Sequence, residues 1–567
     1  MMKANNKMKL DEFNHQVWLE CADCGHRTPF VRPLKACEQC GGKWLDARYD
    51  YDRVRELWPA VLRDRPFDMW RYRELLPLLD DTHKVTMGEG GTPLLRATNL
   101  GLMLGCPHLY IKDERQGPTG SFKDRQASLA ISVMKEHNVT EAVVASTGNV
   151  AISYSAYSAL AGIKMWTFLT SLVPSEKMRE VALYGSEVVK VTATYDQTKK
   201  VAAQFAARKG LFLDRGIRGI SAREGMKTLA FEIAEQLPVL LGDTNPGGTP
   251  WRAPDWYFQA VSGGMGPAGV WKAFEELVML GLVDKMPKLA CIQAAGCAPM
   301  VNSFEKGLEE AEPVLNPQTL VITIATGSPG PAYSYLSRII REHGGAFEAV
   351  TDEETFRAMH VMAKLDGISM EPAAAAAFAG LFKLLNKGII QRDEVIVVNC
   401  SGHTFPVEKH LLGDEWARTV NVPAEKMPVA IEEGLLGSLG QLDGRVRSIA
   451  ILEDDPKAAL LLRRILQTRG EYRIFEAHDG AGGLDLVRRE RPDLILLDLM
   501  MPGIDGFAVL EALKDDEDLS KIPVIVITAK ELTSSERQYL SGRIDKLMQK
   551  GSFTDEELLE EILKRAA

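Results

Sequence analysis

The sequence predicts an α/β protein in which a small metal-binding ribbon precedes two separate open α/β domains. Its 567 residues are too many for one hydrophobic core. Short β-rich runs alternate with helical patterns from about residue 86 to 410, and again from about 447 onward. Four of the eight cysteines form two CxxC pairs within the first 40 residues. We therefore expect a ribbon and packing segment (1–60), a large domain (61–425), a linker (426–446) and a second domain (447–567).

Composition narrows the possible partners and the compartment. Charged residues make up 25% of the chain and the formal net charge is −10, which argues against nucleic acid or an acidic membrane surface as a partner. No apolar run approaches the roughly 18 residues that cross a bilayer. The N-terminal stretch MMKANNKMKLDEFNH lacks the apolar core of a signal peptide. We expect a cytoplasmic protein that binds neither nucleic acid nor membrane.

The two cysteine pairs, CADC and CEQC, consist of Cys21, Cys24, Cys37 and Cys40, with twelve residues between the pairs. This spacing can bring four thiolates to one tetrahedral centre, which suits Zn²⁺. The alternatives are reduced thiols or two disulfides, and a reducing compartment disfavours disulfides. Because few basic residues flank the pairs, we expect a structural zinc site rather than a nucleic-acid module.

The stretch GPTGSFKDR (117–125) places Lys123 among small residues, at the predicted start of a helix that follows a strand. The carboxyl ends of such strands are where open α/β sheets bind ligands. Burial disfavours the charge of an amine and lowers its pKa. One reason to bury this amine is an imine with an aldehyde cofactor that carries a phosphate. Taken alone, the stretch also fits a surface lysine at a helix start.

Three further stretches supply groups that would complete such a site. EAVVASTGNVAISYSAYSAL (141–160) has Asn149 in a tight turn before a helix. SGGMG (262–266) exposes backbone N–H groups at a helix start, an arrangement that binds phosphate. DEVIVVNCSGH (393–403) is a buried strand that ends at Ser401. Pyridoxal phosphate needs a lysine, an amide, a phosphate loop and a hydroxyl of this kind around its ring.

Over about 320 residues the chain resembles threonine synthase and its relatives among the fold-type II pyridoxal phosphate enzymes, whose fold is tryptophan synthase β-like. The resemblance is carried by GEGGTPLL, KDERQGPTGSFKDR, STGN, REGMKTLAFEIAEQL and GISMEPAAAA. It implies that Lys123 forms the Schiff base and moves protons at Cα. It also implies that Asn149 bonds the ring's 3-hydroxyl and that Ser401 lies beside the ring nitrogen, which favours eliminations and replacements at Cβ or Cγ. The implied phosphate ligands are the backbone N–H groups of Gly263, Gly264, Met265 and Gly266.

The stretch ahead of EGMKT departs from this resemblance. Threonine synthases usually carry Asn or Ser and an Arg there, which bind the phosphate of O-phosphohomoserine. Here Gly and Ile replace the small polar residues, and Ala222 stands where the Arg is expected. The substrate-phosphate candidates that remain are Ser121, Arg215, Arg218, Arg223 and Lys227, with plain surface charge as the alternative for the arginines. We expect a lyase that makes threonine from O-phosphohomoserine and water. The alternative is β-elimination or β-replacement on a phosphoserine-like or serine-like amino acid.

The C-terminal domain has polar residues at the ends of its predicted apolar strands. Asp454 and Asp455 follow the first strand, Asp498 the third, Thr528 the fourth and Lys550 the fifth. Parallel strand ends converge on one edge of a sheet. Crowded carboxylates there call for a divalent cation, and oxygen-only ligands favour Mg²⁺. A carboxylate, a metal ion, a hydroxyl and a lysine can together accept and hold a phosphoryl group.

This set is similar, over about 120 residues, to the receiver domain of two-component response regulators. The resemblance implies that Asp498 is the phosphoacceptor and that Asp454 and Asp455 bind Mg²⁺ with it. Thr528 and Lys550 would then form the receiver switch.

One receiver position departs from the pattern, because Leu547 stands where receivers often carry Tyr or Phe. No output domain follows, so we expect the enzyme itself to be the output of phosphorylation. The alternative is a non-catalytic, ligand-sensing scaffold in two-component signalling. The expected partners are a small amino-acid substrate and a sensor histidine kinase or phosphotransfer protein, and the family suggests a homodimer.

Overall fold

The structure is a computed structural model. It describes residues 17–31, 34, 36–242, 249–403, 447–467, 472–530, 532–540, 543–544 and 546–549. The predicted linker (426–446) and Lys550 lie outside the described residues. Within the described part, none of the helices combines the length and the apolar character that a bilayer-spanning segment requires.

A three-stranded antiparallel sheet forms the N-terminal ribbon, with the order β2-β1-β3. Its strands are β1 (Val17–Cys21), β2 (Arg27–Pro29) and β3 (Leu45–Tyr49). In β1 and β3 buried and partly exposed residues alternate, because only one face of an antiparallel sheet packs on the protein. Helix α2 (Tyr51–Val61) follows and is capped by Asp50, whose side chain accepts a hydrogen bond from the N–H of Arg53.

A six-stranded sheet forms the centre of the next part, with the order β12-β11-β10-β13-β5-β4. Its strands are β4 (Leu94–Arg96), β5 (Leu109–Asp113), β10 (Trp256–Ala260), β11 (Lys288–Ala294), β12 (Gly345–Val350) and β13 (Ile396–Cys400). Every neighbouring pair is parallel except β4 with β5. Strands β5, β10 and β13 are buried along their whole length, as expected of strands covered on both faces.

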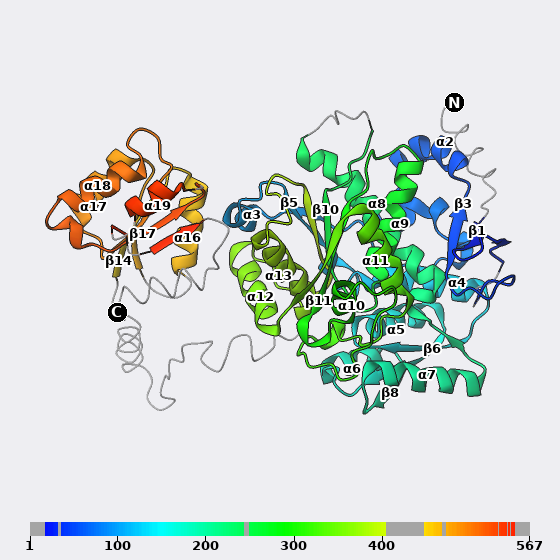
Figure 1. Ribbon diagram of the computed structural model, residues 1–567. Helices are drawn as coiled ribbons and strands as arrows, with labels where there is room; N and C mark the ends of the chain where they lie inside the picture. Colours follow the sequence, from blue (N-terminus) through cyan, green and yellow to red (C-terminus); the bar gives the residue numbers. More distant parts are fainter. Residues whose placement is uncertain are drawn as a thin grey trace, which may run out of the picture. The chain divides into compact units, whose positions relative to one another are not determined.

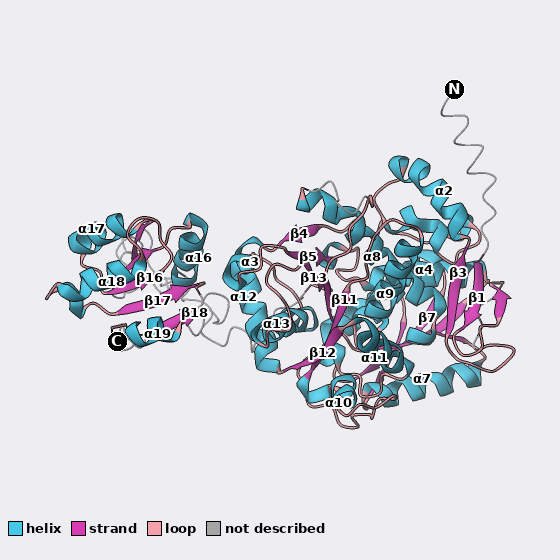
Figure 2. Ribbon diagram, turned by 45° about the horizontal axis from the view of Figure 1, so that its top comes forward, coloured by secondary structure: helices cyan, strands magenta, loops and turns pink. Residues whose placement is uncertain are grey.

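A second, four-stranded parallel sheet has the order β8-β7-β6-β9. Its strands are β6 (Glu141–Ser146), β7 (Lys164–Thr170), β8 (Glu187–Val191) and β9 (Phe212–Leu213). The helices of residues 98–386 are α3 (Thr98–Leu104), α4 (Lys123–Glu136), α5 (Asn149–Ala161), α6 (Ser175–Leu183), α7 (Tyr195–Lys209), α8 (Ile220–Leu241), α9 (Met265–Met279), α10 (Pro299–Glu305), α11 (Pro331–His343), α12 (Asp352–Leu365) and α13 (Pro372–Asn386). Figures 1 and 2 show α13 on one side of the six-stranded sheet and α8, α9 and α11 on the other.

Helix α8 packs tightly against α4 and α9, and residues of the EGMKT stretch explain why. A Cβ on Gly225 would lie 2.5 Å from the backbone oxygen of Arg125 in α4, so only glycine allows this approach. Lys227, fully buried, bonds Glu224 of its own helix and Glu276 of α9, each at 2.7 Å. Because buried charges must stay paired, these contacts fix how α8 is turned about its axis.

The C-terminal part is a five-stranded, wholly parallel sheet with the order β15-β14-β16-β17-β18. Its strands are β14 (Arg447–Leu452), β15 (Tyr472–Ala477), β16 (Leu494–Leu497), β17 (Val524–Thr528) and β18 (Lys546–Gln549). Its described helices are α16 (Pro456–Gln467), α17 (Gly480–Glu490), α18 (Gly506–Asp515) and α19 (Ser534–Leu540). This part has a hydrophobic core of its own. The predicted β–α alternation is therefore confirmed.

Candidate active site

A cavity of about 540 Å³ receives residues from both sheets of the larger part. Lys123 follows β5, Asn149 follows β6, Asp214 follows β9, the loop 263–266 follows β10, and Ser401 follows β13. In open α/β folds, ligands bind at these carboxyl ends of the strands. The structure thus brings together the four groups that the sequence singled out, and it adds Asp214.

Lys123 is the first residue of α4, and its Nζ lies 4.1 Å from the ring centroid of Phe122. Burial lowers the pKa of Lys123 from 10.5 to about 8, while the carboxylates of Glu371 and Asp214 partly oppose this shift. The N–H of Phe122 donates to the carbonyl oxygen of Ser401 at 3.0 Å, which ties the start of α4 to the end of β13. The lysine is thus held at the strand edge with part of its amine neutral near pH 7.

Asn149 is held by two residues that the sequence analysis did not single out. Its Nδ2 donates to Oε1 of Glu371 at 2.7 Å, and its Oδ1 accepts from Nζ of Lys177 at 2.8 Å. Lys177 and Glu371 also form an ion pair at 3.1 Å. Glu371 belongs to the GISMEPAAAA stretch that carried part of the resemblance, so a signal for it existed. Lys177 lies outside every motif of the sequence analysis, so no signal in the sequence pointed to it.

The loop 263–266 enters α9 at Met265, and Gly264 adopts a φ of +73°, which a side chain would strain. A Cβ on Gly263 would meet nothing within 4 Å, so the loop leaves space for a ligand. The first backbone N–H groups of a helix have no acceptor within that helix. A phosphate fits this position well. The amine, glycine loop and hydroxyl in one cavity therefore fit pyridoxal phosphate.

The substrate-phosphate candidates do not all reach the cavity. Arg218 lines it, together with Arg215. Ser121, Arg223 and Lys227 are absent from its lining. Ser121 is buried, and its Oγ has no hydrogen-bond partner among the described residues.

Two of these candidates are engaged elsewhere. The Arg223 guanidinium bonds Asp46 of the ribbon at 3.0 Å, and Lys227 is paired between Glu224 and Glu276. The helical phase of α8 turns both side chains towards these partners. The sequence could not reveal this, because the partners lie far away along the chain.

Asp214 is a buried carboxyl group of the cavity that the sequence analysis missed. It accepts hydrogen bonds from the Tyr154 hydroxyl at 3.2 Å and from the N–H of Gly216 at 3.1 Å. Burial raises the pKa of Asp214 to about 6, although these hydrogen bonds and Lys123 oppose the rise. Near neutral pH the group is therefore mostly an anion close to the amine of Lys123.

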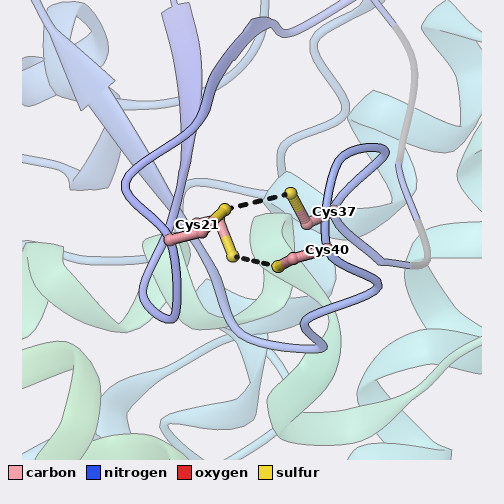
Figure 3. A group of neighbouring side chains, drawn as sticks. Cys21, Cys37 and Cys40 are labelled. Atoms are coloured by element: carbon pink, nitrogen blue, oxygen red, sulfur yellow. Dashed lines mark hydrogen bonds between the residues drawn. The ribbon is translucent and has the colours of Figure 1, made fainter.

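The four ribbon cysteines converge on one point, and Figure 3 labels three of them, Cys21, Cys37 and Cys40. Sγ of Cys21 lies 3.6 Å from Sγ of Cys40, and Sγ of Cys24 lies 3.7 Å from Sγ of Cys37. These separations far exceed the S–S bond length of about 2.05 Å in a disulfide. They are close to the edge of about 3.8 Å in a tetrahedron whose Zn–S distance is about 2.3 Å. The donor set and its geometry therefore fit zinc.

The acidic group of the C-terminal part differs from the predicted one in one member. The oxygens of Glu453, Asp454 and Asp498 lie within 4.8 Å of one another. Asp455 does not belong to this group. Its Oδ1 accepts from the N–H of Lys457 at the start of α16, at 2.9 Å. The Mg²⁺ ligand set predicted from Asp454, Asp455 and Asp498 stays a prediction, and the structure places Glu453 rather than Asp455 beside the other two.

The other receiver positions are only partly described. Thr528 is buried at the end of β17, and its Oγ1 accepts from the N–H of Lys530 at 3.2 Å. Leu547 lies in β18 and packs against the core of this part. Lys550, predicted as part of the switch, is outside the described residues.

Comparison with known proteins identifies both parts. Residues 85–402 match the family described as pyridoxal-phosphate dependent enzymes. The chain belongs to this family. Residues 449–563 match the response regulator receiver domain. The chain is therefore a pyridoxal-phosphate dependent enzyme that also carries a receiver domain.

Relatives of this pyridoxal-phosphate dependent enzyme include two archaeal threonine synthases. The one from Methanocaldococcus jannaschii is 38% identical over 385 residues, which is 68% of this chain and 91% of the relative. The one from Methanosarcina acetivorans is 34% identical over 386 residues, with the same coverage of both chains. Among solved structures, diaminopropionate ammonia lyase from Escherichia coli covers 58% of this chain and 88% of its own, with a TM-score of 0.49 and 17% identity.

Proposed function

We propose that this enzyme is a lyase of the threonine synthase type, which converts O-phosphohomoserine and water to threonine and phosphate. The observation that carries the proposal is one cavity that holds the Lys123 amine, the 263–266 loop and Ser401. The similarity to threonine synthases along 91% of their length supports the substrate class.

The chain's own residues would hold the cofactor at both ends. The backbone N–H groups of 263–266 and the start of α9 bind its phosphate. Ser401 would face the ring nitrogen, and Asn149 would bond the 3-hydroxyl; both line the cavity. Pyridoxal phosphate, joined to the Lys123 amine, supplies an electron sink for charge that develops at the substrate's Cα.

Lys123 also moves protons in this proposal. Its amine lies in the cavity that would hold the substrate, so it could take up and return a proton at the substrate's Cα. A pKa of about 8 lets this amine accept a proton near neutral pH and return it in a later step. Glu371 and Asp214 stabilise the protonated form between these steps.

The substrate's phosphate would leave towards the cations of the cavity. Arg215 and Arg218 line the cavity on either side of Gly216 and Ile217. A guanidinium matches the geometry of a phosphate and stays charged at any working pH. We propose these two residues as ligands of the leaving phosphate.

A second candidate is elimination or replacement at Cβ of a phosphoserine-like or serine-like amino acid. Ala222 favours it, because a methyl group at this position of α8 cannot bind the phosphate that an arginine would bind. The same cavity and the same amine would serve that chemistry.

The test is incubation of the full-length holoenzyme with O-phosphohomoserine, then with phosphoserine, with phosphate and amino-acid products measured. Threonine and phosphate in equal amounts from O-phosphohomoserine support the proposal. Turnover of phosphoserine alone selects the second candidate. Lys123→Ala is the control and should abolish turnover. No turnover of either substrate by a protein that shows the cofactor's absorbance contradicts both candidates.

We also propose that the four cysteines hold one structural Zn²⁺ ion. Metal analysis of the purified protein should give one zinc per chain. Cys24→Ser should lower this content and the midpoint of thermal unfolding, because a structural zinc site contributes directly to folding. A fully folded protein without zinc, with unchanged thermal stability, contradicts the site.

For the receiver domain we propose phosphorylation of Asp498, with Mg²⁺ held by Glu453, Asp454 and Asp498. A sensor histidine kinase or a phosphotransfer protein would be the donor, and the pyridoxal-phosphate dependent enzyme would be the output. Acetyl phosphate with Mg²⁺ should label the full-length protein, whereas Asp498→Ala should stay unlabelled. Equal labelling of the variant contradicts the assignment.

A further inference from the structure

Arg223 lies near the start of α8, with 2% of its side chain exposed, and it faces the ribbon. Its Nη2 donates to the carbonyl oxygen of Leu45 and, at 3.0 Å, to Oδ1 of Asp46. Its guanidinium carbon also lies 4.5 Å from the ring centroid of Trp44. The guanidinium is therefore bound on one side by the residues that lead into β3 and begin it.

On its other side, the same guanidinium contacts a residue that lines the substrate cavity. Its Nη1 donates to the carbonyl oxygen of Ile217 at 3.1 Å. Ile217 is the middle residue of a short 3-10 turn (Gly216–Arg218) that lines the cavity and carries Arg218. One buried side chain thus connects the ribbon to the wall of the active site.

Besides this bond, the turn is held by its own backbone bonds and by the Ile217 side chain, which packs against the main hydrophobic core. Gly216 adopts a φ of +57°, and the residue after the turn, Gly219, also lacks a side chain. The N–H of Gly216 bonds Oδ2 of Asp214, and the N–H of Gly219 bonds the carbonyl oxygen of Gly216 at 2.7 Å. These bonds lie within the segment itself. The bond from Arg223 attaches the turn to a different part of the fold.

The ribbon can serve as an anchor because it is firmly attached. Lys272 of α9 donates to the carbonyl oxygen of Ala47. The Tyr49 hydroxyl donates to Glu224 of α8 at 2.7 Å. The Trp44 ring stacks on Tyr335 of α11 at 4.6 Å. Strand β3 and the residue that precedes it are therefore held by three helices of the catalytic part.

The position of the arginine along α8 explains this arrangement. Consecutive residues of an α-helix are turned by about 100° about its axis. An arginine at 223 instead of 222 therefore points in a different direction, and here that direction leads to the ribbon. Ala222, one position earlier, has only a methyl group.

We infer that Arg223 is a positioning residue that fixes the 216–218 turn against the ribbon, so that the ribbon helps to hold the anionic end of the substrate. Arg223 touches neither the substrate nor the cofactor. It acts through the Ile217 carbonyl on the placement of Arg218. The inference rests on the proposed function only where substrate kinetics are used.

The first test is hydrogen exchange of the backbone amides of 214–219 in full-length holoenzyme, for wild type, Arg223→Met and Lys272→Met. Lys272→Met is the matched control, because it removes a buried cation that docks the ribbon but does not contact the turn. In Arg223→Met the amides of Gly216 and Gly219 should exchange about tenfold faster than in wild type. The reason is the loss of the hydrogen bond from the charged guanidinium to the turn. Lys272→Met should leave these two amides nearly unchanged, because Tyr49 and Trp44 still attach the ribbon to α8 and α11 in that variant. Equal exchange in the two variants overturns the inference.

The second test uses steady-state kinetics with O-phosphohomoserine. Arg223→Met and Arg223→Lys should each raise KM about tenfold with kcat nearly unchanged, because a lysine cannot span Asp46 and Ile217 together. Lys272→Met should show no comparable rise in KM. A fall in kcat with unchanged KM overturns the inference. If wild type does not turn over this substrate, the proposed function has failed, and the exchange experiment alone decides on Arg223.

Discussion

At the scale of single residues, Lys123 shows how its surroundings set its chemistry. Attack on an aldehyde needs the neutral amine, and a pKa of about 8 leaves about one tenth of the amine neutral at pH 7. We predict that the rate at which cofactor-free protein regains the absorbance of bound pyridoxal phosphate rises with pH, with a midpoint near 8. The measurement is the absorbance change after mixing, at a series of pH values.

Asp214→Asn provides the control for this midpoint. The Asp214 carboxylate favours the charged amine, so its removal should lower the pKa of Lys123 and move the midpoint to lower pH. A midpoint near 10.5 in the wild type, or an upward movement in the variant, would contradict this account of the amine.

The receiver's acidic group gives a second prediction at this scale. Glu453→Gln should reduce labelling by acetyl phosphate at limiting Mg²⁺ by about tenfold or more, because even indirect partners of a metal site are worth about that factor. Asp455→Asn should label like wild type, since an asparagine can still accept from the N–H of Lys457. If instead Asp455→Asn lost labelling and Glu453→Gln kept it, the result would favour the Mg²⁺ ligands predicted from the sequence, which include Asp455.

At the scale of elements, the contact between α8 and α9 depends on buried charges. We predict that Lys227→Met lowers the free energy of unfolding by about 3–5 kcal/mol. Lys227 and Lys272 together balance Glu224 and Glu276, so the variant leaves one buried carboxylate without a compensating cation. Urea denaturation measures this loss. Lys306→Met, which breaks the exposed pair with Glu312, should cost less than about 1 kcal/mol. Similar losses in the two variants would show that the buried cluster is not essential.

The elements that carry the site could be predicted because their signals are local. Around Lys123, Asn149 and 263–266, consecutive residues carry the pattern of a strand, a glycine-containing turn and a helix start. What could not be predicted is the direction of a side chain whose partner is distant in sequence. Arg223 and Lys227 were expected near the substrate, yet their partners lie on the ribbon and on α9. The strand end before Asp454 is another example, because the sequence did not show that Glu453 lies beside Asp454 and Asp498.

At the scale of the whole molecule, the catalytic part and the receiver have separate hydrophobic cores. We predict two calorimetric transitions, because each core can unfold by itself. Pyridoxal phosphate at about 100 times its Kd should stabilise the catalytic part by about 2.7 kcal/mol and raise that transition only. A single transition, or one in which the cofactor shifts both, would contradict independent unfolding.

The cofactor's proposed contacts come from two sheets that share no strand. Lys123, the 263–266 loop and Ser401 follow strands of the six-stranded sheet, whereas Asn149 follows a strand of the four-stranded sheet. Bound pyridoxal phosphate would therefore fasten the two sheets together from within. In a cell short of vitamin B6, newly made chains would lack this fastening and be cut sooner by proteases. The supply of a vitamin would then set how many copies of this enzyme survive, as well as how fast each one works.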